Sequence, residues 1–332
     1  MVKIVFATRI HRVAFEILRK YGFEVEVYEG GRYPPKEWFR EKLIDADALV
    51  VTPMHRVDEE LLGYGPRLKV VALFGSGYEN IDIDACSRRK VCVFREPEAI
   101  DRAVAEHVLA LVLSLMRKVV EGDRYVREGR WSEGPAPREL LSSSLEGKKI
   151  GIVGMGLLGR YVAQLFRRLG LEVMYWSRRR KLDVEENLGL QYVELDDLLA
   201  QSDVVIVTVA YTPETHHLID ERRLRKMKSS AILVNVSRGG VVDTNALVKA
   251  LSEGWIRGAA LDVFEEEPLP PDHPLTKLRN VVLTPHIAGY TREAMIETSR
   301  SLAEDLVRIF IERKLPKHVL NGDVCASILN AL

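Results

Sequence analysis

The segment IGIVGMGLLGR (residues 150–160) places Gly154, Gly156 and Gly159 between two different hydrophobic patterns. An apolar run typical of a buried β-strand precedes the glycines, and the pattern RYVAQLFRRLG that overlaps their end is typical of an amphipathic helix. Gly154 permits a tight turn, Gly156 lets the backbone approach a pyrophosphate, and Gly159 lets the helix pack closely on the strand. In this strand–turn–helix context the motif favours a dinucleotide site at the helix N-terminus over a merely structural turn.

Apolar runs alternate with amphipathic segments along most of the chain, which indicates repeated βα units and parallel sheets. The strand-like runs are KIVFAT, FEVEVYE, ALVVT, KVVALF and VCVF in the first hundred residues, then LEVMYW, VVIVTVA, AILVNVS, AALDVF and VVLTPHI after the glycine motif. A length of 332 residues with 47% hydrophobic content is sufficient for about two domains with buried cores. We therefore predict an α/β protein with two similar doubly wound parallel-sheet domains.

Three other segments are expected to connect and cover these domains. Residues 101–127 predict one long helix, whose middle AVAEHVLALVLSLMR is apolar nearly all round and must be buried between domains or subunits, so Glu106 and His107 are assigned structural roles. The segment GRWSEGPAPRELLSSSLEGKK is rich in Gly, Pro and Ser and predicts an arm over a neighbouring surface. Residues 292–314 predict a long amphipathic helix whose partner domain the periodicity does not name.

Composition excludes several classes of protein. Forty-eight basic and forty-eight acidic residues give a formal net charge of zero, so no global field attracts nucleic acid or an anionic membrane. No apolar run approaches the ~18 residues of a membrane-spanning helix, and the N-terminus does not resemble a signal peptide. Three cysteines without a CxxC pair argue against a disulfide framework and against a zinc site, which favours a reducing cytoplasm.

The strand-like run LEVMYW ends against Ser177, Arg178, Arg179, Arg180 and Lys181. A dinucleotide site that selects NAD has an acidic residue ~20 residues after the glycine motif, where it binds the ribose 2′-hydroxyl. This sequence places a hydroxyl and cations there, which predicts a phosphate on that ribose and hence NADP in preference to NAD, with NAD possible. The alternative is a solvated loop, and it applies most readily to Arg180 and Lys181.

Six motifs in order make the chain resemble the D-isomer-specific 2-hydroxyacid dehydrogenase family, in particular its glyoxylate and hydroxypyruvate reductases. They are GSGYENID (75–82), VAEH (104–107), GMGLLG (154–159), NVSRGGVVD (235–243), ALDVFEEEP (260–268) and TPHIAG (284–289). The resemblance implies a flavodoxin-like substrate domain, residues 1–100 and 290–332, and a Rossmann cofactor domain, residues 101–289, with a cleft between them. It also implies a homodimer joined through the cofactor domains.

Reduction of a 2-keto acid needs a proton donor for the carbonyl oxygen and a cation for the carboxylate. His286 in TPHIAG is similar to the family's acid/base histidine, and Glu267 matches the glutamate that pairs with it. Such a carboxylate favours the protonated histidine and holds one tautomer. Arg238 in NVSRGG matches the substrate arginine, whose planar fork suits a carboxylate. The resemblance thus implies three catalytic residues, Arg238, Glu267 and His286.

The remaining site residues are expected around the cofactor and the substrate carboxylate. The cofactor-binding residues we predict are Gly154, Gly156, Leu157, Leu158, Gly159, Ser177, Arg178, Arg179, Val236, Ser237 and Asp262, the last near the nicotinamide ribose or carboxamide. The substrate-binding residues we predict are Gly75, Ser76, Gly77 and Arg238, with backbone N–H groups of the GSG turn on the carboxylate. We expect the shape of the substrate pocket to depend on Met54, His55, Leu73 and Phe74.

The sequence is consistent with three functions. The leading one is a reductase that converts small 2-keto acids, glyoxylate or hydroxypyruvate, to D-2-hydroxy acids. The second is an NAD enzyme similar to phosphoglycerate dehydrogenase. The third is a non-enzymatic dinucleotide-sensing module of the corepressor type, which this chain's lack of a disordered extension disfavours.

Overall fold

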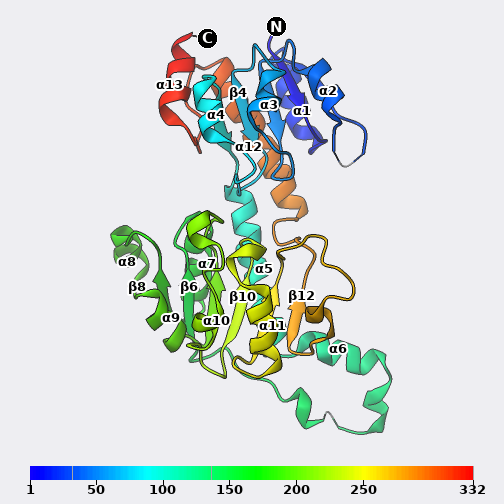
Figure 1. Ribbon diagram of the computed structural model, residues 1–332, viewed down its shortest axis with the longest axis vertical. Helices are drawn as coiled ribbons and strands as arrows, with labels where there is room; N and C mark the ends of the chain where they lie inside the picture. Colours follow the sequence, from blue (N-terminus) through cyan, green and yellow to red (C-terminus); the bar gives the residue numbers. More distant parts are fainter. Residues whose placement is uncertain (32, 136, 332) are drawn as a thin grey trace. The chain divides into compact units, whose positions relative to one another are not determined.

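The computed structural model describes residues 1–31, 33–135 and 137–331. By their contacts the described residues fall into two compact units, unit 1 with Met1–Asp101 and Tyr290–Leu332, and unit 2 with Arg102–Gly289 (Figure 1). Among the described residues, no helix combines the length and the apolar composition needed to span a membrane.

Unit 1 contains a parallel sheet in the order β2-β1-β3-β4-β5. The strands are β1 (Lys3–Phe6), β2 (Glu24–Val27), β3 (Ala48–Val51), β4 (Val70–Leu73) and β5 (Cys92–Arg95). Val5 in β1 pairs with Glu26 on one side and with Leu49 on the other. This order is the flavodoxin-like one, so the expected fold of the first hundred residues is confirmed.

Helices cover both faces of this sheet. They are α1 (Arg12–Lys20), α2 (Lys36–Lys42), α3 (Glu59–Gly63), α4 (Ile83–Arg88), α12 (Arg292–Phe310) and α13 (Gly322–Ala331). Residues of α1, α12 and α13 share one apolar cluster with Ile4 and Phe6, whereas residues of α2, α3 and α4 pack with Val5 and Leu49 on the other face. The long amphipathic helix expected near the C-terminus is therefore α12, and it packs beside α1 in unit 1 (Figure 1).

The cysteines correct one expectation. Cys92 at the start of β5 and Cys325 in α13 form a disulfide across a sequence separation of 233 residues. The remaining thiol, Cys86, is buried, and burial raises its pKa to about 12. Our prediction against disulfides was wrong because residue spacing carries no information about a helix that returns to the sheet from the far end of the chain.

Unit 2 contains a second parallel sheet, in the order β12-β11-β10-β9-β6-β7-β8. The strands are β6 (Lys149–Val153), β7 (Glu172–Trp176), β8 (Gln191–Tyr192), β9 (Val204–Val207), β10 (Ile232–Asn235), β11 (Gly258–Leu261) and β12 (Val281–Leu283). Numbered from β6, the core of this order reads 3-2-1-4-5-6, the doubly wound arrangement of dinucleotide-binding domains. The expected Rossmann fold is confirmed.

The helices of unit 2 depart from expectation at one place. They are α5 (Glu98–Met116, which begins in unit 1), α6 (Val119–Arg127), α7 (Leu157–Arg168), α8 (Leu182–Leu188), α9 (Leu195–Gln201), α10 (Glu221–Leu224) and α11 (Thr244–Ser252). Short 3₁₀ turns are η1 (Arg130–Glu133), η2 (Arg138–Leu140), η3 (Pro213–Thr215), η4 (Gly239–Val241) and η5 (Pro274–Lys277). The single helix predicted over residues 101–127 is wrong, because Lys118 has a left-handed φ of 53° that separates α5 from α6.

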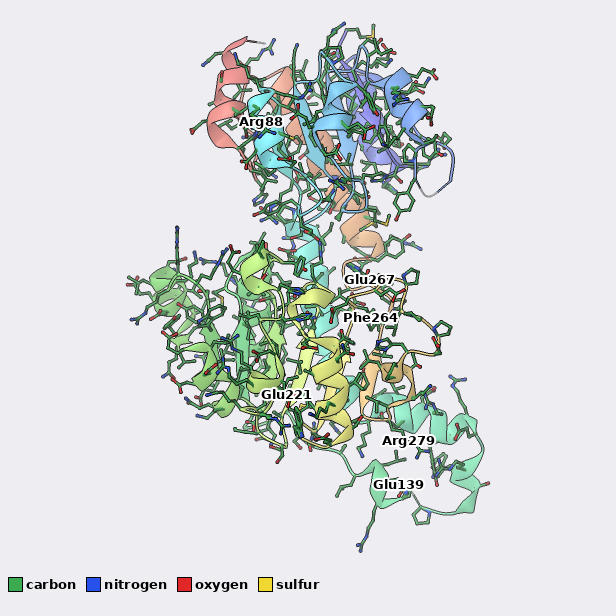
Figure 2. All side chains as sticks on the ribbon, in the orientation of Figure 1. Arg88, Glu139, Glu221, Phe264, Glu267 and Arg279 are labelled. Carbon is green, nitrogen blue, oxygen red and sulfur yellow. A yellow bond between two sulfur atoms is a disulfide. The ribbon has the colours of Figure 1, made fainter. Side chains whose placement is uncertain are left out.

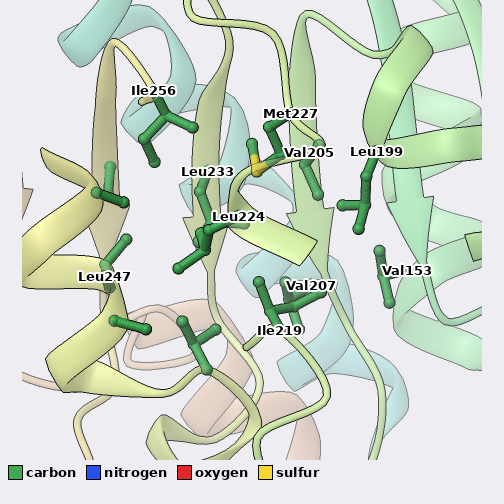
Figure 3. Packing of buried hydrophobic residues seen from close by; sticks show 14 of the residues in the cluster. Val153, Leu199, Val205, Val207, Ile219, Leu224, Met227, Leu233, Leu247 and Ile256 are labelled. Atoms are coloured by element: carbon green, nitrogen blue, oxygen red, sulfur yellow. The ribbon is translucent and has the colours of Figure 1, made fainter. Parts of the chain in front are cut away.

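The core of unit 2 positions the strand ends that carry the site. Side chains of α9, α10 and α11 pack on one face of the sheet, against Val205 and Val207 of β9 and Leu233 of β10 (Figure 3). On the opposite face, a Cβ atom at Gly258 would lie 3.2 Å from Leu115 of α5, so that helix packs closely on β11. The sheet is thus covered on both sides, as a parallel sheet requires.

Candidate active site

The sequence motifs of unit 2 follow the carboxyl ends of neighbouring strands. Asn235 of β10 pairs with Leu261 of β11, which pairs with Leu283 of β12. Three loops therefore begin side by side at one edge of the sheet. They carry Arg238 after β10, Asp262 and Glu267 after β11, and His286 after β12. Open α/β sheets bind their ligands at this edge.

His286 and Glu267 form a close pair. Nδ1 of His286 lies 2.7 Å from Oε2 of Glu267, and both side chains are partly exposed. The other carboxylate oxygen accepts the backbone N–H of Phe264 at 3.0 Å, which fixes the glutamate within its own loop (Figure 2). With Nδ1 turned to the carboxylate, Nε2 is the nitrogen that can exchange a proton with a substrate.

Electrostatics keep the Glu267 carboxylate ionised. Burial by itself would raise the pKa of Glu267, but hydrogen bonds from His286 and from the Phe264 N–H outweigh it, with a further contribution from the charges of His286 and Arg238. The pKa of Glu267 consequently lies below its ordinary value. The positive charge of Arg238 acts in the same direction as that of His286.

Arg238 lies directly before η4, in a turn that packs tightly on the loop after β11. Its Nη1 donates to the Ser237 carbonyl at 2.8 Å, and its own carbonyl accepts Nδ2 of Asn235 at 3.0 Å. A Cβ atom at Gly239 would lie only 1.9 Å from the carbonyl carbon of Phe264, so only glycine permits this approach. The two loops that carry Arg238 and Glu267 are therefore held together by backbone contact.

Asp262 makes contacts that the sequence did not predict. Its side chain is 1% exposed, and it accepts three hydrogen bonds from the TPHIAG loop. Oδ1 accepts the Thr284 hydroxyl at 2.6 Å and the Ile287 N–H at 3.0 Å, and Oδ2 accepts the Ala288 N–H at 2.9 Å. These bonds flank His286, whose φ of 55° is uncommon for a residue with a Cβ atom. Asp262 thus fixes the backbone that presents the histidine.

Replacing Asp262 by asparagine should loosen this loop. One carboxylate oxygen becomes an NH₂ group, which leaves a buried N–H of the loop without its acceptor, and such a loss costs roughly 1–3 kcal/mol. We expect the free energy of unfolding in urea to fall by about that amount and kcat to fall with it. Asp272→Asn makes the same chemical change at an exposed position and should alter neither quantity. Equal urea midpoints for the two variants would contradict the role of Asp262.

His107 of α5 extends this network. Its Nε2 lies 3.1 Å from the Thr284 hydroxyl and 3.7 Å from Oδ1 of Asp262. The sequence assigned His107 a structural role. In the structure His107 contacts Thr284, which belongs to the loop that carries His286. Neither His107 nor Thr284 was among the predicted site residues. Thr284 lies within the TPHIAG motif, but nothing in the sequence indicated that its hydroxyl reaches Asp262.

The glycine turn between β6 and α7 has the predicted local geometry. Gly154 has a φ of 110°, and a Cβ atom there would lie 2.8 Å from the Val209 nitrogen. A Cβ at Gly159 would lie 2.3 Å from the Gly154 carbonyl oxygen, which shows how closely the helix packs on the turn. At Gly156, the N-cap of α7, a Cβ would meet no atom within 4 Å. Open space at a helix N-terminus fits a pyrophosphate, and Leu157 and Leu158 form the first helical turn beside it.

Of the residues after β7, Ser177 and Arg180 form hydrogen bonds within the protein, whereas Arg178 and Arg179 face solvent. Ser177 is buried, and its hydroxyl donates to the Arg179 carbonyl at 2.7 Å. Arg180 makes a bidentate ion pair with Glu185, at 2.8 Å and 2.7 Å, which matches the alternative considered for this residue. Arg178 and Arg179 are exposed, and their guanidinium groups make no hydrogen bond to the described residues. Arg178 does act on Glu214, whose pKa is lowered first by a Thr212 hydrogen bond and also by the Arg178 charge.

The other predicted cofactor residues lie in the turn after β10. Val236 and Ser237 are both buried. The Ser237 hydroxyl donates to Oδ1 of Asn235 at 2.9 Å, and its backbone N–H reaches the same oxygen at 3.1 Å. These bonds shape the turn that leads to Arg238.

The GSG turn follows β4 in unit 1. A Cβ atom at Gly75 would lie 2.9 Å from Cγ of Pro53, so the turn lies against the loop after β3. The backbone N–H groups of Ser76 and Gly77 donate to no acceptor within the described residues, as a carboxylate-binding turn requires. Arg95, which the sequence did not predict, donates from Nη1 to the Ser76 carbonyl and approaches its hydroxyl at 3.3 Å.

Of the four residues expected to shape the substrate pocket in unit 1, one is exposed and three are buried. Met54 is half exposed, and His55 is buried with its Nδ1 2.8 Å from the Thr52 hydroxyl. Leu73 and Phe74 instead lie in the two apolar clusters on opposite faces of the sheet. Their place near a substrate stays a prediction, since Leu73 ends β4 and Phe74 is the first residue after it.

Comparison with known proteins agrees with this geometry. Residues 109–288 match the family model described as D-isomer specific 2-hydroxyacid dehydrogenase, NAD binding domain. A glyoxylate reductase from Aeropyrum pernix is 45% identical over 96% of both chains, and one from Thermococcus litoralis is 42% identical over 97% of this chain and 98% of the relative. The crystal structure of an NADPH-dependent glyoxylate/hydroxypyruvate reductase from Sinorhizobium meliloti, in complex with NADP and malonate, matches with a TM-score of 0.84 at 29% identity, covering 96% of this chain and 97% of that one. The chain is an NAD(P)-dependent oxidoreductase and belongs to the D-isomer-specific 2-hydroxyacid dehydrogenase family.

Proposed function

We propose that this chain is an NADPH-preferring reductase of small 2-keto acids, glyoxylate or hydroxypyruvate, and that it forms D-2-hydroxy acids. The observation that carries the proposal is the His286–Glu267 pair at 2.7 Å, with Arg238 close enough for its charge to act on Glu267. The names of the relatives supply the substrate class, because the matched curated proteins are glyoxylate reductases.

His286 supplies the proton in this scheme. Reduction of the C2 carbonyl adds a hydride to its carbon and a proton to its oxygen, and a positioned acid accelerates the proton transfer. Nε2 of His286 holds that proton, because Nδ1 is engaged by the ionised Glu267. The carboxylate stabilises the imidazolium before the transfer and keeps the correct tautomer after it. In the oxidative direction the same nitrogen takes the proton back.

The substrate carboxylate needs positive charge and N–H donors. Arg238 provides a planar guanidinium at the carboxyl edge of unit 2, and the GSG turn of unit 1 provides the backbone N–H groups of Ser76 and Gly77. We propose that both hold the carboxylate. A guanidinium also polarises the neighbouring carbonyl, which favours reduction.

The residues of unit 2 fit a nicotinamide dinucleotide, which supplies the hydride when it is bound. The open space at Gly156 suits the pyrophosphate, and Ser177 with Arg178 and Arg179 suits a ribose 2′-phosphate. Residues 177–181, which follow β7, include no acidic residue that would bind a ribose 2′-hydroxyl.

A panel of substrates with both cofactors tests the proposal. Oxidation of NADPH is expected with glyoxylate and hydroxypyruvate, at a kcat/KM at least about tenfold higher than with NADH. Reduction of NAD by D-3-phosphoglycerate at a higher kcat/KM than that of glyoxylate reduction would favour the phosphoglycerate dehydrogenase-like alternative. No turnover with any keto acid would reject the proposal.

We also propose that the protein is a homodimer joined through unit 2. Several large apolar side chains are exposed on α6 and the following arm: Val119, Val120, Val126, Trp131 and Leu141. Exposed apolar side chains gathered on one segment indicate a surface that another chain covers. A second copy is the simplest partner, since most soluble oligomers are symmetric assemblies of one chain.

Light scattering should therefore give twice the chain mass of 37.6 kDa at micromolar concentration. Trp131→Glu should shift the protein toward monomer, because it places a charge on the apolar surface. Tyr290→Glu changes a similarly exposed aromatic residue outside this segment and should leave the dimer intact. A monomeric wild type would reject the dimer.

A further inference from the structure

We propose that Tyr175 is a positioning residue for cofactor discrimination: its buried hydroxyl holds the loop of residues 177–181 so that Arg178 and Arg179 remain available to a 2′-phosphate. This inference rests on the proposed NADPH preference and extends it from the residues that touch the phosphate to the contacts that hold them.

Tyr175 is an unusual residue for its position. It lies in β7 with its side chain 0% exposed, where an apolar residue would pack without needing hydrogen bonds. A buried phenol must satisfy its hydroxyl, and this one makes two hydrogen bonds that both lead to the loop. The hydroxyl donates to Oε1 of Glu185 at 2.8 Å and accepts the backbone N–H of Lys181 at 2.8 Å.

Each bond fixes a different part of the loop. The bond from the Lys181 N–H ties the end of the loop to the strand where it begins. Glu185 in turn binds Arg180 through both carboxylate oxygens, and its side chain is only 16% exposed. At the start of the loop, the Ser177 hydroxyl closes a short turn onto the Arg179 carbonyl. The chain between these fixed points carries Arg178 and Arg179 outward.

Charges around Tyr175 keep this arrangement stable near neutral pH. Burial raises the pKa of Tyr175 to about 12, so its hydroxyl keeps the proton that it donates. The hydrogen bond from Arg180 lowers the pKa of Glu185, so the carboxylate stays ionised. The charge of Arg180 is thereby neutralised by Glu185. The guanidinium groups of Arg178 and Arg179 make no hydrogen bond to the described residues.

A preformed loop binds phosphate more tightly because its ordering cost is met before the ligand arrives. Without the hydroxyl, the Lys181 N–H and Glu185 each lose a partner, and the loop can move away from the conformation that presents the two arginines. Loss of the Tyr175 hydroxyl should therefore weaken binding of the 2′-phosphate and leave binding of the rest of the dinucleotide unchanged.

Tyr175→Phe tests this role, and Tyr192→Phe is its matched control. The two rings lie in edge contact with centroids 5.5 Å apart, but the Tyr192 hydroxyl bonds Glu194 instead of the loop. Calorimetry would compare adenosine 2′,5′-bisphosphate with 5′-AMP, which differ only in the 2′-phosphate. We expect Tyr175→Phe to lower the ratio of the two affinities about fivefold, the equivalent of one hydrogen bond, and Tyr192→Phe to leave it unchanged.

The possible outcomes separate this inference from the proposed function. A wild-type affinity ratio near one would reject the NADPH preference and the role of Tyr175 with it. A clear wild-type preference that Tyr175→Phe leaves within about twofold would reject the role of Tyr175 alone. Hydrogen exchange on the unliganded wild type tests the contact without any variant: the Lys181 amide should be protected, and exchange at the rate of a free amide would overturn the inference.

Discussion

His286→Asn should lower kcat for keto acid reduction by roughly 10²- to 10⁴-fold, the range expected when a general acid is lost. Asparagine is close in size and polarity, but it cannot carry a proton to the carbonyl oxygen. The affinity for the reduced cofactor should remain nearly unchanged, because His286 bonds Glu267 and lies in a loop separate from the glycine turn. Steady-state kinetics together with fluorescence titration of NADPH would measure both quantities.

A pair of glutamate variants provides the control for this prediction. Glu267→Gln removes the charge that holds His286, so kcat should fall, though less than in His286→Asn. Glu266→Gln makes the same change one residue earlier, at an exposed side chain, and should leave kcat unaffected. If His286→Asn kept more than half of the wild-type kcat, the histidine would not be the acid.

Arg178→Ala should weaken NADPH binding about tenfold or more and change NADH binding little. Charge-assisted hydrogen bonds contribute ~1.5–3 kcal/mol each, and at an exposed site the net effect is smaller, so a ten- to hundredfold preference is expected for the wild type. Arg178 is an exposed residue and is therefore accessible to a ligand. The NADPH affinity of the wild type should also fall with added salt, because the contact is ionic and near solvent.

Arg168→Ala is the matched control, because it removes the same charge from an exposed position at the far end of α7. It should leave the KM values for NADPH and NADH unchanged. A wild type that used both cofactors equally well would show that the cationic run is a solvated loop. The same conclusion would follow if Arg178→Ala preserved the ratio of the two KM values.

The sequence predicted the fold well because its signals were local. Hydrophobic periodicity located most strands, and the GxGxxG spacing located the turn at Gly154. The motifs around Arg238, Glu267 and His286 predicted residues that the structure places at one edge of the sheet, because parallel strands bring their carboxyl ends together. Periodicity did not predict the break at Lys118, since a single left-handed residue leaves the apolar pattern on both sides intact.

Contacts between distant segments were the part that the sequence could not supply. Asp262 was assigned to the cofactor by resemblance, and only the folded chain shows its bonds to Thr284, Ile287 and Ala288. The Cys92–Cys325 disulfide likewise depends on how α13 returns to β5. Glu96 is another example, since burial and the nearby Asp305 raise its pKa to about 8, an environment that no local pattern indicates.

The most direct test is the rate of NADPH oxidation when glyoxylate is added to the purified wild-type protein, with NADH measured in parallel. A glyoxylate-dependent loss of the reduced nicotinamide absorbance is expected, faster with NADPH than with NADH at subsaturating cofactor. This glyoxylate-dependent rate should nearly vanish in the His286→Asn variant. No oxidation of either cofactor with glyoxylate or hydroxypyruvate would contradict the assignment of this chain as a 2-keto acid reductase.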